Sequence, residues 1–221
     1  MMKTVALIVY AEHTEELLAE CRRQIDLIPK DEYTFEMFVN PDLDEAWRAA
    51  GERDFYIWLH GLVMPVDGAL YSILDNSSFL GDRALLVGTV QDGEGRNVSG
   101  GFGRNRRILP PDPVIPVPCK MFDGLFALVP KDVYQKIGVL GGRYRGQLAG
   151  FDYAMRARKA GFPSVITPGI TCTCPVRPNP DRTLAADFML DLRTRGIFSA
   201  VWYFLRSTFR RFVIHNLSVY E

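Results

Sequence analysis

The chain has 221 residues, of which 48% are apolar, and its 26 basic residues balance its 26 acidic residues. This length suits one large domain or a domain with an appendage, and the apolar content is enough for a full core. The balanced charge excludes a global attraction to nucleic acid, so any charged partner must be recognised locally. The spacing of the four cysteines forms no disulfide framework, and they indicate reduced thiols in a cytoplasmic protein.

The N-terminal half alternates between predicted strands and predicted helices. Strands are expected at 4–10, 33–39, 55–60 and 84–90, where β-branched, apolar and aromatic residues concentrate. Helices are expected at 14–24, at 42–53 and from Pro65 to about Asn76. Asp42 and Glu45 form a D-x-x-E pattern that is typical of a helix cap. The alternation predicts an α/β fold with a mixed, mostly parallel sheet between helices.

The pattern changes after residue 92. A turn at 92–95 separates two short strands, and 100–118 is expected to be a long loop. A strand is expected at 126–129, a short helix at 131–137 and a last strand at 164–167. Between them a helix at 151–160 carries Asp152 in its first turn. Cys172 and Cys174 are expected in a loop at a strand end, since a metal site would need a second pair of ligands.

The segment 176–221 is expected to be a helical extension of a domain that spans 1–175. A helix is predicted at 183–195, and another at 197–214 has an amphipathic pattern. Its apolar positions are Phe198, Trp202, Leu205, Phe209 and Phe212, whereas Arg206, Arg210 and Arg211 lie largely off that face. Such a face packs on its own domain, on a second copy in a homodimer, or on a membrane surface. The sequence leaves these three outcomes open.

The turn after the first strand excludes two common classes of nucleotide-binding enzyme. Residues 10–13 contain neither a G-x-G-x-x-G fingerprint nor a Walker pattern, which disfavours a dehydrogenase and a P-loop enzyme. The glycines at 100–103 do not change this, because they open a loop and not a helix.

Several longer stretches together resemble a family-two glycosyltransferase of the GT-A fold, especially the members that build bacterial cell-surface polysaccharide. The stretches are TVALIVY, FYIWLHGLVMPVDGALYSIL, LLVGTVQDGEGRNVSGG, FDGLFALVPKDVYQKIGVLGGRY and GFDYAMRARKAGFPSVITPG, and they cover roughly residues 3–175. The resemblance implies transfer of a sugar, with inversion, from a nucleotide-sugar donor to a hydroxyl group of a saccharide or a lipid-linked saccharide. A lipid-linked acceptor would place the protein at the inner face of the membrane.

The resemblance also implies roles for particular residues. Asp152 corresponds to the general base, which takes the proton of the attacking acceptor hydroxyl, and the alternative is a carboxylate that only caps its helix. Asp123 and Gly124 fall where the family contacts the acceptor and the donor sugar, with a strand-edge turn as the alternative. The expected nucleotide contacts are Tyr10, Glu12, Asn40, Asp42 and His60. For Asp42, a helix cap is the competing interpretation.

One part of the family's donor site is missing. The family's Asp-X-Asp motif holds Mn²⁺ or Mg²⁺ against the donor diphosphate, but His60 and Gly61 stand at that point. No carboxylate occurs between Asp54 and Asp67. A single histidine replaces oxygen ligands poorly, so the sequence assigns no metal ligands and no certain cofactor.

Two explanations of the missing motif stay open. Arg104, Arg106 and Arg107 in the long loop could neutralise the diphosphate, because guanidinium groups suit phosphate. The simpler interpretation of these arginines is a solvated basic loop. Alternatively the chain has lost catalysis and acts as a binding or assembly protein on the same scaffold.

Overall fold

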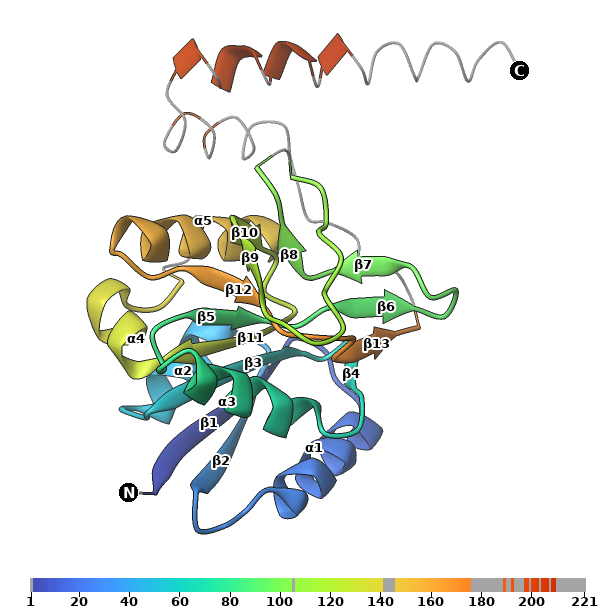
Figure 1. Ribbon diagram of the computed structural model, residues 1–221, viewed down its shortest axis with the longest axis vertical. Coiled ribbons are helices and arrows are strands. Elements are labelled where there is room, and N and C mark those ends of the chain that lie inside the picture. Colours follow the sequence, from blue (N-terminus) through green and yellow to red (C-terminus); the bar gives the residue numbers. More distant parts are fainter. Residues whose placement is uncertain are drawn as a thin grey trace.

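The computed structural model describes residues 2–104, 106–140 and 146–175, together with 189, 192, 197–198, 200–202, 204–206 and 208–209. At its centre lies a seven-stranded sheet with the order β2-β1-β3-β11-β5-β12-β9 (Figure 1). Its strands are β1 (Lys3–Tyr10), β2 (Tyr33–Asn40), β3 (Phe55–His60), β5 (Leu85–Val87), β9 (Val117–Cys119), β11 (Phe126–Pro130) and β12 (Ser164–Ile166). Only β11 and β9 run against the other strands, which confirms the predicted mixed, mostly parallel sheet.

Helices cover both faces of this sheet. They are α1 (Glu15–Leu27), α2 (Leu43–Ala50), α3 (Ala69–Phe79), α4 (Lys131–Ile137) and α5 (Gly146–Lys159). In β1, Val5 and Leu7 pack with α1 and α3, whereas Ala6 and Ile8 pack with α2, α4 and α5. Successive strand residues point to opposite faces, so burial on both sides explains the continuous apolar run of β1.

Two smaller sheets extend the central one. The first has the order β4-β13-β6-β7, and the second pairs β8 with β10. Their strands are β4 (Met64–Pro65), β6 (Val90–Asp92), β7 (Asn97–Ser99), β8 (Gly101–Phe102), β10 (Met121–Phe122) and β13 (Cys172–Cys174). Because β4, β6 and β13 follow β3, β5 and β12 along the chain, the first small sheet lies beyond the carboxyl ends of the central strands (Figure 1).

Some predicted boundaries in the N-terminal half are wrong. Pro65 does not open a helix, because it pairs with Cys172 in the first small sheet, and α3 begins later, at Ala69. Helix α2 ends at Ala50 and not at residue 53, since Gly51 takes a left-handed φ of 64°. The two errors differ in cause. The pairing of Pro65 joins distant residues and leaves no local pattern, whereas Gly51 is itself a sequence signal for a helix end.

The second half shows similar differences. The predicted strand 84–90 is divided into β5 and β6, because the chain leaves the central sheet at residues 88–89. The predicted loop 100–118 contains β8 and the start of β9. Cys172 and Cys174 lie in a strand and not in a loop, and all four cysteines are free and buried.

Most of the predicted C-terminal extension lies outside the described residues, including nearly all of the helix expected at 183–195. The division of the chain at residue 175 therefore stays a prediction. Every described residue between 197 and 209 is helical. Among the helices of the described part, none combines the length and the apolar character that crossing a bilayer requires.

Helix α5 lies directly against the backbone at the end of β10. A Cβ atom on Gly150 would stand 2.5 Å from the carbonyl oxygen of Phe122 and 2.7 Å from the carbonyl carbon of Asp123. Real Cβ atoms do not approach backbone so closely. Gly150 therefore allows the close contact between α5 and the segment that follows β10.

Replacing Gly150 by Ala should lower the free energy of unfolding by about 1–3 kcal/mol, because the new methyl group overlaps backbone atoms that cannot rotate away. In an uncrowded helix the same change would stabilise the protein by about 1 kcal/mol. The sign of the change in unfolding free energy therefore shows whether the site is crowded. Gly93→Ala is the control, since no described atom lies within 4 Å of a Cβ at that position. Urea denaturation measures both variants, and a Gly150→Ala protein as stable as the wild type would contradict the close contact.

Candidate functional site

Three of the predicted nucleotide contacts share one edge of the central sheet. The strand register places Tyr10, the last residue of β1, opposite both Asn40 of β2 and His60 of β3. The rings of Tyr10 and His60 contact each other edge to face, with centroids 4.9 Å apart. Open α/β sheets bind ligands outside the carboxyl ends of their strands, which is where these residues end.

The segment Asp123–Leu125 crosses this edge immediately before β11. The Tyr10 hydroxyl donates a hydrogen bond of 2.9 Å to the carbonyl of Gly124, and the backbone N–H of His60 donates one of 2.8 Å to the carbonyl of Leu125. Gly124 has a φ of 87°, which a residue with a side chain rarely adopts. The structure therefore brings the predicted acceptor residues together with Tyr10 and His60.

The Asp123 carboxylate is buried, with 6% of the residue exposed. Its Oδ1 accepts a hydrogen bond of 2.6 Å from the Ser99 hydroxyl, and backbone N–H groups of Leu125 and Gly100 also donate to the carboxylate. Burial raises the pKa of Asp123 to about 6, and the hydrogen bonds oppose that rise. Burial and then the Asp123 charge raise the pKa of Tyr10, whose phenol stays protonated. A carboxyl group of this kind can take up and release a proton near neutral pH.

His60 is fixed as a neutral ring with a defined tautomer. Its Nδ1 accepts a hydrogen bond of 3.1 Å from the backbone N–H of Leu62, so the ring proton must sit on Nε2. Burial lowers the pKa of His60, which keeps the ring uncharged. His60 therefore offers one N–H donor from Nε2 and has no free lone pair on Nδ1.

The residues at the end of β3 do not fit the divalent cation that the family resemblance implies. Mn²⁺ and Mg²⁺ prefer several oxygen ligands, and His60 offers an engaged Nδ1 and an N–H group. Within the described ranges, no group of three or more His, Cys, Asp or Glu side chains is arranged to hold a metal ion. The Nε2–H group of His60 can donate to an anion but cannot ligate a cation.

The remaining predicted nucleotide contacts lie on loops around the same edge. Glu12 is exposed in the loop after β1, and its carbonyl oxygen would stand 1.8 Å from a Cβ on Gly61. The Asn40 side chain accepts a hydrogen bond of 2.8 Å from the N–H of Asp42. Asp42 caps α2 by accepting one of 2.9 Å from the N–H of Glu45, which confirms its cap role. Nucleotide contact by these residues stays a prediction.

Asp152 does not lie at the start of its helix. The described helix α5 runs from Gly146, so the predicted bounds 151–160 are wrong and Asp152 sits mid-helix. The proposed cap role is wrong for the same reason. Asp152 is buried, and its Oδ2 accepts a hydrogen bond of 2.9 Å from Arg156 Nε in an i,i+4 ion pair.

Arg156 links this carboxylate to the connection that follows α4. Its two terminal nitrogens donate to the carbonyls of Ile137, Val139 and Leu140 at 2.9, 3.1 and 2.8 Å. The ion pair therefore fastens the backbone after α4 to α5. This structural role competes with catalysis by Asp152.

Gly150 and Asp152 lie on nearly opposite sides of α5, because two residues of an α-helix turn through about 200°. The Gly150 side faces the backbone of Asp123. The Asp152 carboxylate accepts a hydrogen bond from Arg156, whereas that of Asp123 accepts one from Ser99, so the two carboxylates have different described partners.

The three predicted phosphate-binding arginines lie on a hairpin turn beyond β8. The backbone N–H of Gly103 donates to the carbonyl of Arg107 at 2.9 Å, which helps to close the turn. Arg104 and Arg107 are exposed, whereas Arg106 is half-buried with its guanidinium 6.0 Å from the ring centroid of Phe151. Packing on Phe151 anchors the turn to α5, one residue before Asp152.

Strands β8 and β10 connect this turn to the site. Gly101 pairs with Phe122, which directly precedes Asp123. Arg104 follows Gly101 by three residues along the chain, so the turn lies beyond the strand pair that leads to Asp123. Contact of these arginines with a diphosphate stays a prediction.

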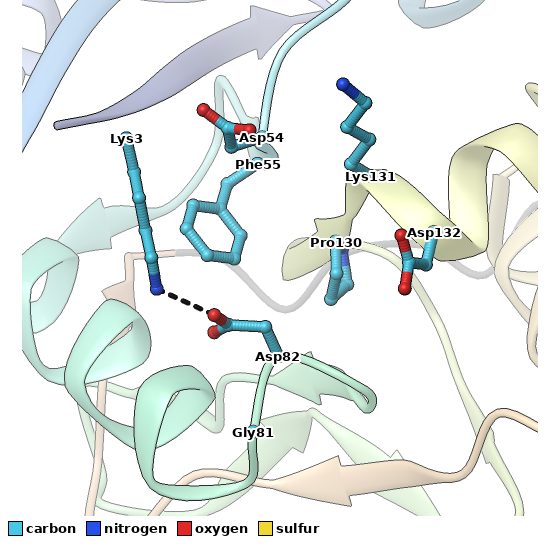
Figure 2. Close-up of a pocket in the computed structure, with 8 residues that line it drawn as sticks. All are labelled: Lys3, Asp54, Phe55, Gly81, Asp82, Pro130, Lys131 and Asp132. Carbon is cyan, nitrogen blue, oxygen red and sulfur yellow. Dashed lines mark hydrogen bonds and ion pairs between the residues drawn. The ribbon is translucent and has the colours of Figure 1, made fainter. Parts of the chain in front are cut away.

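A pocket of about 270 Å³ lies at the opposite edge of the sheet, where β1 and β3 begin (Figure 2). It is lined by Lys3, Asp54, Phe55, Gly81, Asp82, Pro130, Lys131 and Asp132. Lys3 points to Asp82 and pairs with it at 2.6 Å, and Lys131 pairs with Glu52 at 2.7 Å. Because these lysines are already paired and no predicted site residue lines the pocket, it is not the candidate site.

Comparison with known proteins bears on the fold. No protein-family model matches the sequence, and no curated protein matches it. Among solved structures, the crystal structure of A197 from STIV matches with a TM-score of 0.51 and 12% identity, over 82% of this chain and 92% of that chain. The crystal structure of GalNAc-T7 with UDP, GalNAc and Mn²⁺ matches with a TM-score of 0.50 and 12% identity, over 86% of this chain and 48% of that chain.

These likenesses define the class of fold. The chain has a GT-A fold of the kind found in glycosyltransferases, as its sequence resemblance implies. At 12% identity the likeness concerns the fold alone. The chain spans about half of the GalNAc-T7 chain that it matches.

Sequence reasoning missed three residues that shape the site. Arg156 could have been found, since it follows Asp152 by four positions on a predicted helix. Ser99 could not, because its bond to Asp123 joins residues 24 positions apart. Gly150 stands out in the sequence only as a glycine, and its close contact with Phe122 depends on how α5 packs.

Replacing Ser99 by Ala should raise the pKa of Asp123 above about 6, because the serine hydroxyl stabilises the charged carboxylate. Carboxyl-carbon NMR titration of the labelled aspartates measures this pKa directly. Ser72→Ala, on α3, serves as the control and should leave the titration of Asp123 unchanged. An unchanged or lowered pKa in the Ser99→Ala protein would contradict the described hydrogen bond.

Proposed function

We propose that the chain is a glycosyltransferase that moves a sugar, with inversion, from a nucleotide-sugar donor to a hydroxyl group of a saccharide or a lipid-linked saccharide. The product class we propose is cell-surface polysaccharide. The observation that carries the proposal is the meeting of Tyr10, His60 and Asp123 at one edge of a GT-A sheet. In open α/β sheets this edge binds the ligand.

The donor half of the proposed site works without a divalent cation. Tyr10 and Asn40, with Glu12 and Asp42 on the adjoining loops, face the nucleotide. The Nε2–H of His60 donates to a diphosphate oxygen, since Nδ1 is engaged by a backbone N–H. The nearby arginine turn supplies the positive charge that the missing aspartates would have recruited as a metal ion.

The acceptor half needs a group that takes the hydroxyl proton. As the acceptor oxygen bonds to the anomeric carbon, the nucleoside diphosphate leaves with the electron pair of the bond that breaks, and the proton passes to a carboxylate. Asp152 has this role by family resemblance, but its carboxylate is paired with Arg156. Asp123 lies in the site itself and has a pKa of about 6, which suits a base near neutral pH. The geometry favours Asp123 as the base and Asp152 as a positioning residue.

Two observations favour a second candidate function. The end of β3 lacks carboxylates, and the carboxylate at the family's base position is held in an ion pair. A chain that has lost catalysis would keep the nucleotide site on the same scaffold for binding or assembly. The two functions differ in turnover and not in nucleotide binding.

The proposal is tested by incubating the chain with a panel of nucleotide-sugars, with and without saccharide acceptors. Turnover is measured as the nucleoside diphosphate released. We expect kcat/KM to fall as pH drops below about 6, because Asp123 becomes protonated and cannot accept a proton.

Asp123→Asn should lower kcat by roughly 10²–10⁴-fold while the fold persists. Asp152→Asn and Arg156→Lys should instead lower the free energy of unfolding by about 3 kcal/mol, because each breaks the ion pair. In both variants, activity should fall together with stability.

Arg156→Lys is the matched control for Asp152→Asn, since it disturbs the ion pair and leaves the carboxylate in place. If Asp152→Asn abolishes turnover at unchanged thermal stability while Arg156→Lys stays active, Asp152 is the base and the assignment to Asp123 is wrong. If no donor is turned over although nucleoside diphosphate binds, the binding function replaces the enzymatic one.

A further inference from the structure

The described part of the C-terminal helix presents large apolar side chains to solvent. Phe198, Trp202, Leu205 and Phe209 are 91%, 67%, 58% and 70% exposed, and we call these four residues the apolar face. They follow one another at intervals of four, three and four residues, which returns to the same side of an α-helix. Figure 1 draws the described residues of this helix in red, apart from the central sheet.

This exposure argues against packing of the apolar face on the chain's own domain, which is one of the three outcomes that the sequence leaves open. A face that packed on its own domain would be covered, whereas each residue of the apolar face is more than half exposed. Ala200, which points to the other side of the helix, is fully buried. The helix therefore covers a small residue and exposes large apolar ones, whereas a surface helix of a globular domain buries its large apolar residues. The apolar face is left for a partner.

The charge around the apolar face indicates which partner. Arg206 is exposed and adjoins Leu205. Along the sequence, further arginines stand within five positions of the apolar face, namely Arg193, Arg195, Arg210 and Arg211. No acidic residue occurs between Leu192 and Tyr220. A second copy docked through this face would bring like charges together, which disfavours a homodimer. An anionic lipid surface offers both an apolar layer for the aromatics and negative headgroups for the arginines.

We propose that the apolar face binds the surface of an anionic lipid bilayer, with the helix lying in the plane of the interface. The aromatic side chains enter the boundary between headgroups and acyl chains, and Arg206 stays at the level of the headgroups. The contact is peripheral and reversible, because one amphipathic helix supplies limited apolar area. This proposal does not depend on glycosyl transfer, although a lipid-linked acceptor would lie at the same surface.

The chain contains its own reporter for this contact. Its three tryptophans all belong to the described residues, and Trp47 and Trp58 are fully buried while Trp202 is exposed. A blue shift of tryptophan fluorescence on adding vesicles would therefore arise from Trp202. We expect the full chain to show this shift, and to co-sediment, with vesicles of phosphatidylcholine and phosphatidylglycerol. Vesicles of phosphatidylcholine alone should give a much weaker response.

Variants distinguish binding through the apolar face from non-specific adsorption to vesicles. Replacing both Phe198 and Trp202 by Ser should weaken vesicle partitioning by roughly tenfold or more. Trp202→Phe should keep the binding and lose the blue shift. Phe79→Ser is the matched control, since Phe79 on α3 is 78% exposed and lies outside the apolar face, and it should bind like the wild type. Arg206→Glu should reduce binding to the anionic vesicles.

Three results would overturn the proposal. The first is failure of the full chain to partition onto the anionic vesicles at low salt, and the second is a Phe198 and Trp202 double variant that partitions as well as the wild type. The third is a dimer, seen by light scattering in the absence of lipid, that the double variant abolishes, because a second copy would then cover the apolar face. Circular dichroism of each variant confirms that the fold is retained.

Discussion

The site depends on how the segment Asp123–Leu125 is held across the carboxyl edge of the sheet. Hydrogen bonds from Tyr10, from the backbone of His60 and from Ser99 reach this segment from three different strands. Each bond fixes a different residue of the segment, so neither its path nor the Asp123 carboxylate can shift independently. Strand β11 begins directly afterwards and runs against both of its neighbours. The reversed strand thus brings a carboxylate back to the edge where the parallel strands end.

Helix α5 connects this edge with a second, structural centre. Its Gly150 side meets the Asp123 backbone, and its Asp152 side holds Arg156 against the carbonyls that follow α4. One helix therefore supports the site on one side and fastens a loop on the other. This division gives Asp152, for which the sequence resemblance implies the role of general base, a part in holding the scaffold together. Asp123 then remains as a carboxylate whose raised pKa suits proton transfer near neutral pH.

The sequence predicted those parts of the fold that local patterns determine. The bounds expected for Phe55–His60 and Lys131–Ile137 agree with β3 and α4, and the predicted cap at Asp42 is present. The sequence predicts a helix start at Pro65 because proline often opens a helix, but the pairing of Pro65 with Cys172 joins residues far apart in the chain. Local periodicity carries no information about such a pairing.

In the candidate site, too, some contacts could be predicted from the sequence and others could not. Tyr10, Asn40 and His60 could be expected at one edge of the sheet, because each stands at the end of a predicted strand and the carboxyl ends of parallel strands share an edge. The bond from Ser99 to Asp123 and the close contact at Gly150 arise from the packing of separate elements. The direction of the Asp152 side chain likewise follows from helix phase and from Arg156, and the family resemblance alone could not give it.

We propose that this edge binds a nucleoside diphosphate without a divalent cation. Isothermal titration calorimetry of the full chain with UDP, GDP, CDP and ADP, each with EDTA and again with Mn²⁺, tests this most directly. We expect binding of at least one of these in EDTA, little change with Mn²⁺, and roughly tenfold weaker binding when Arg104 and Arg107 are both replaced by Gln. Binding that requires Mn²⁺, or no binding of any of the four, would contradict the proposal.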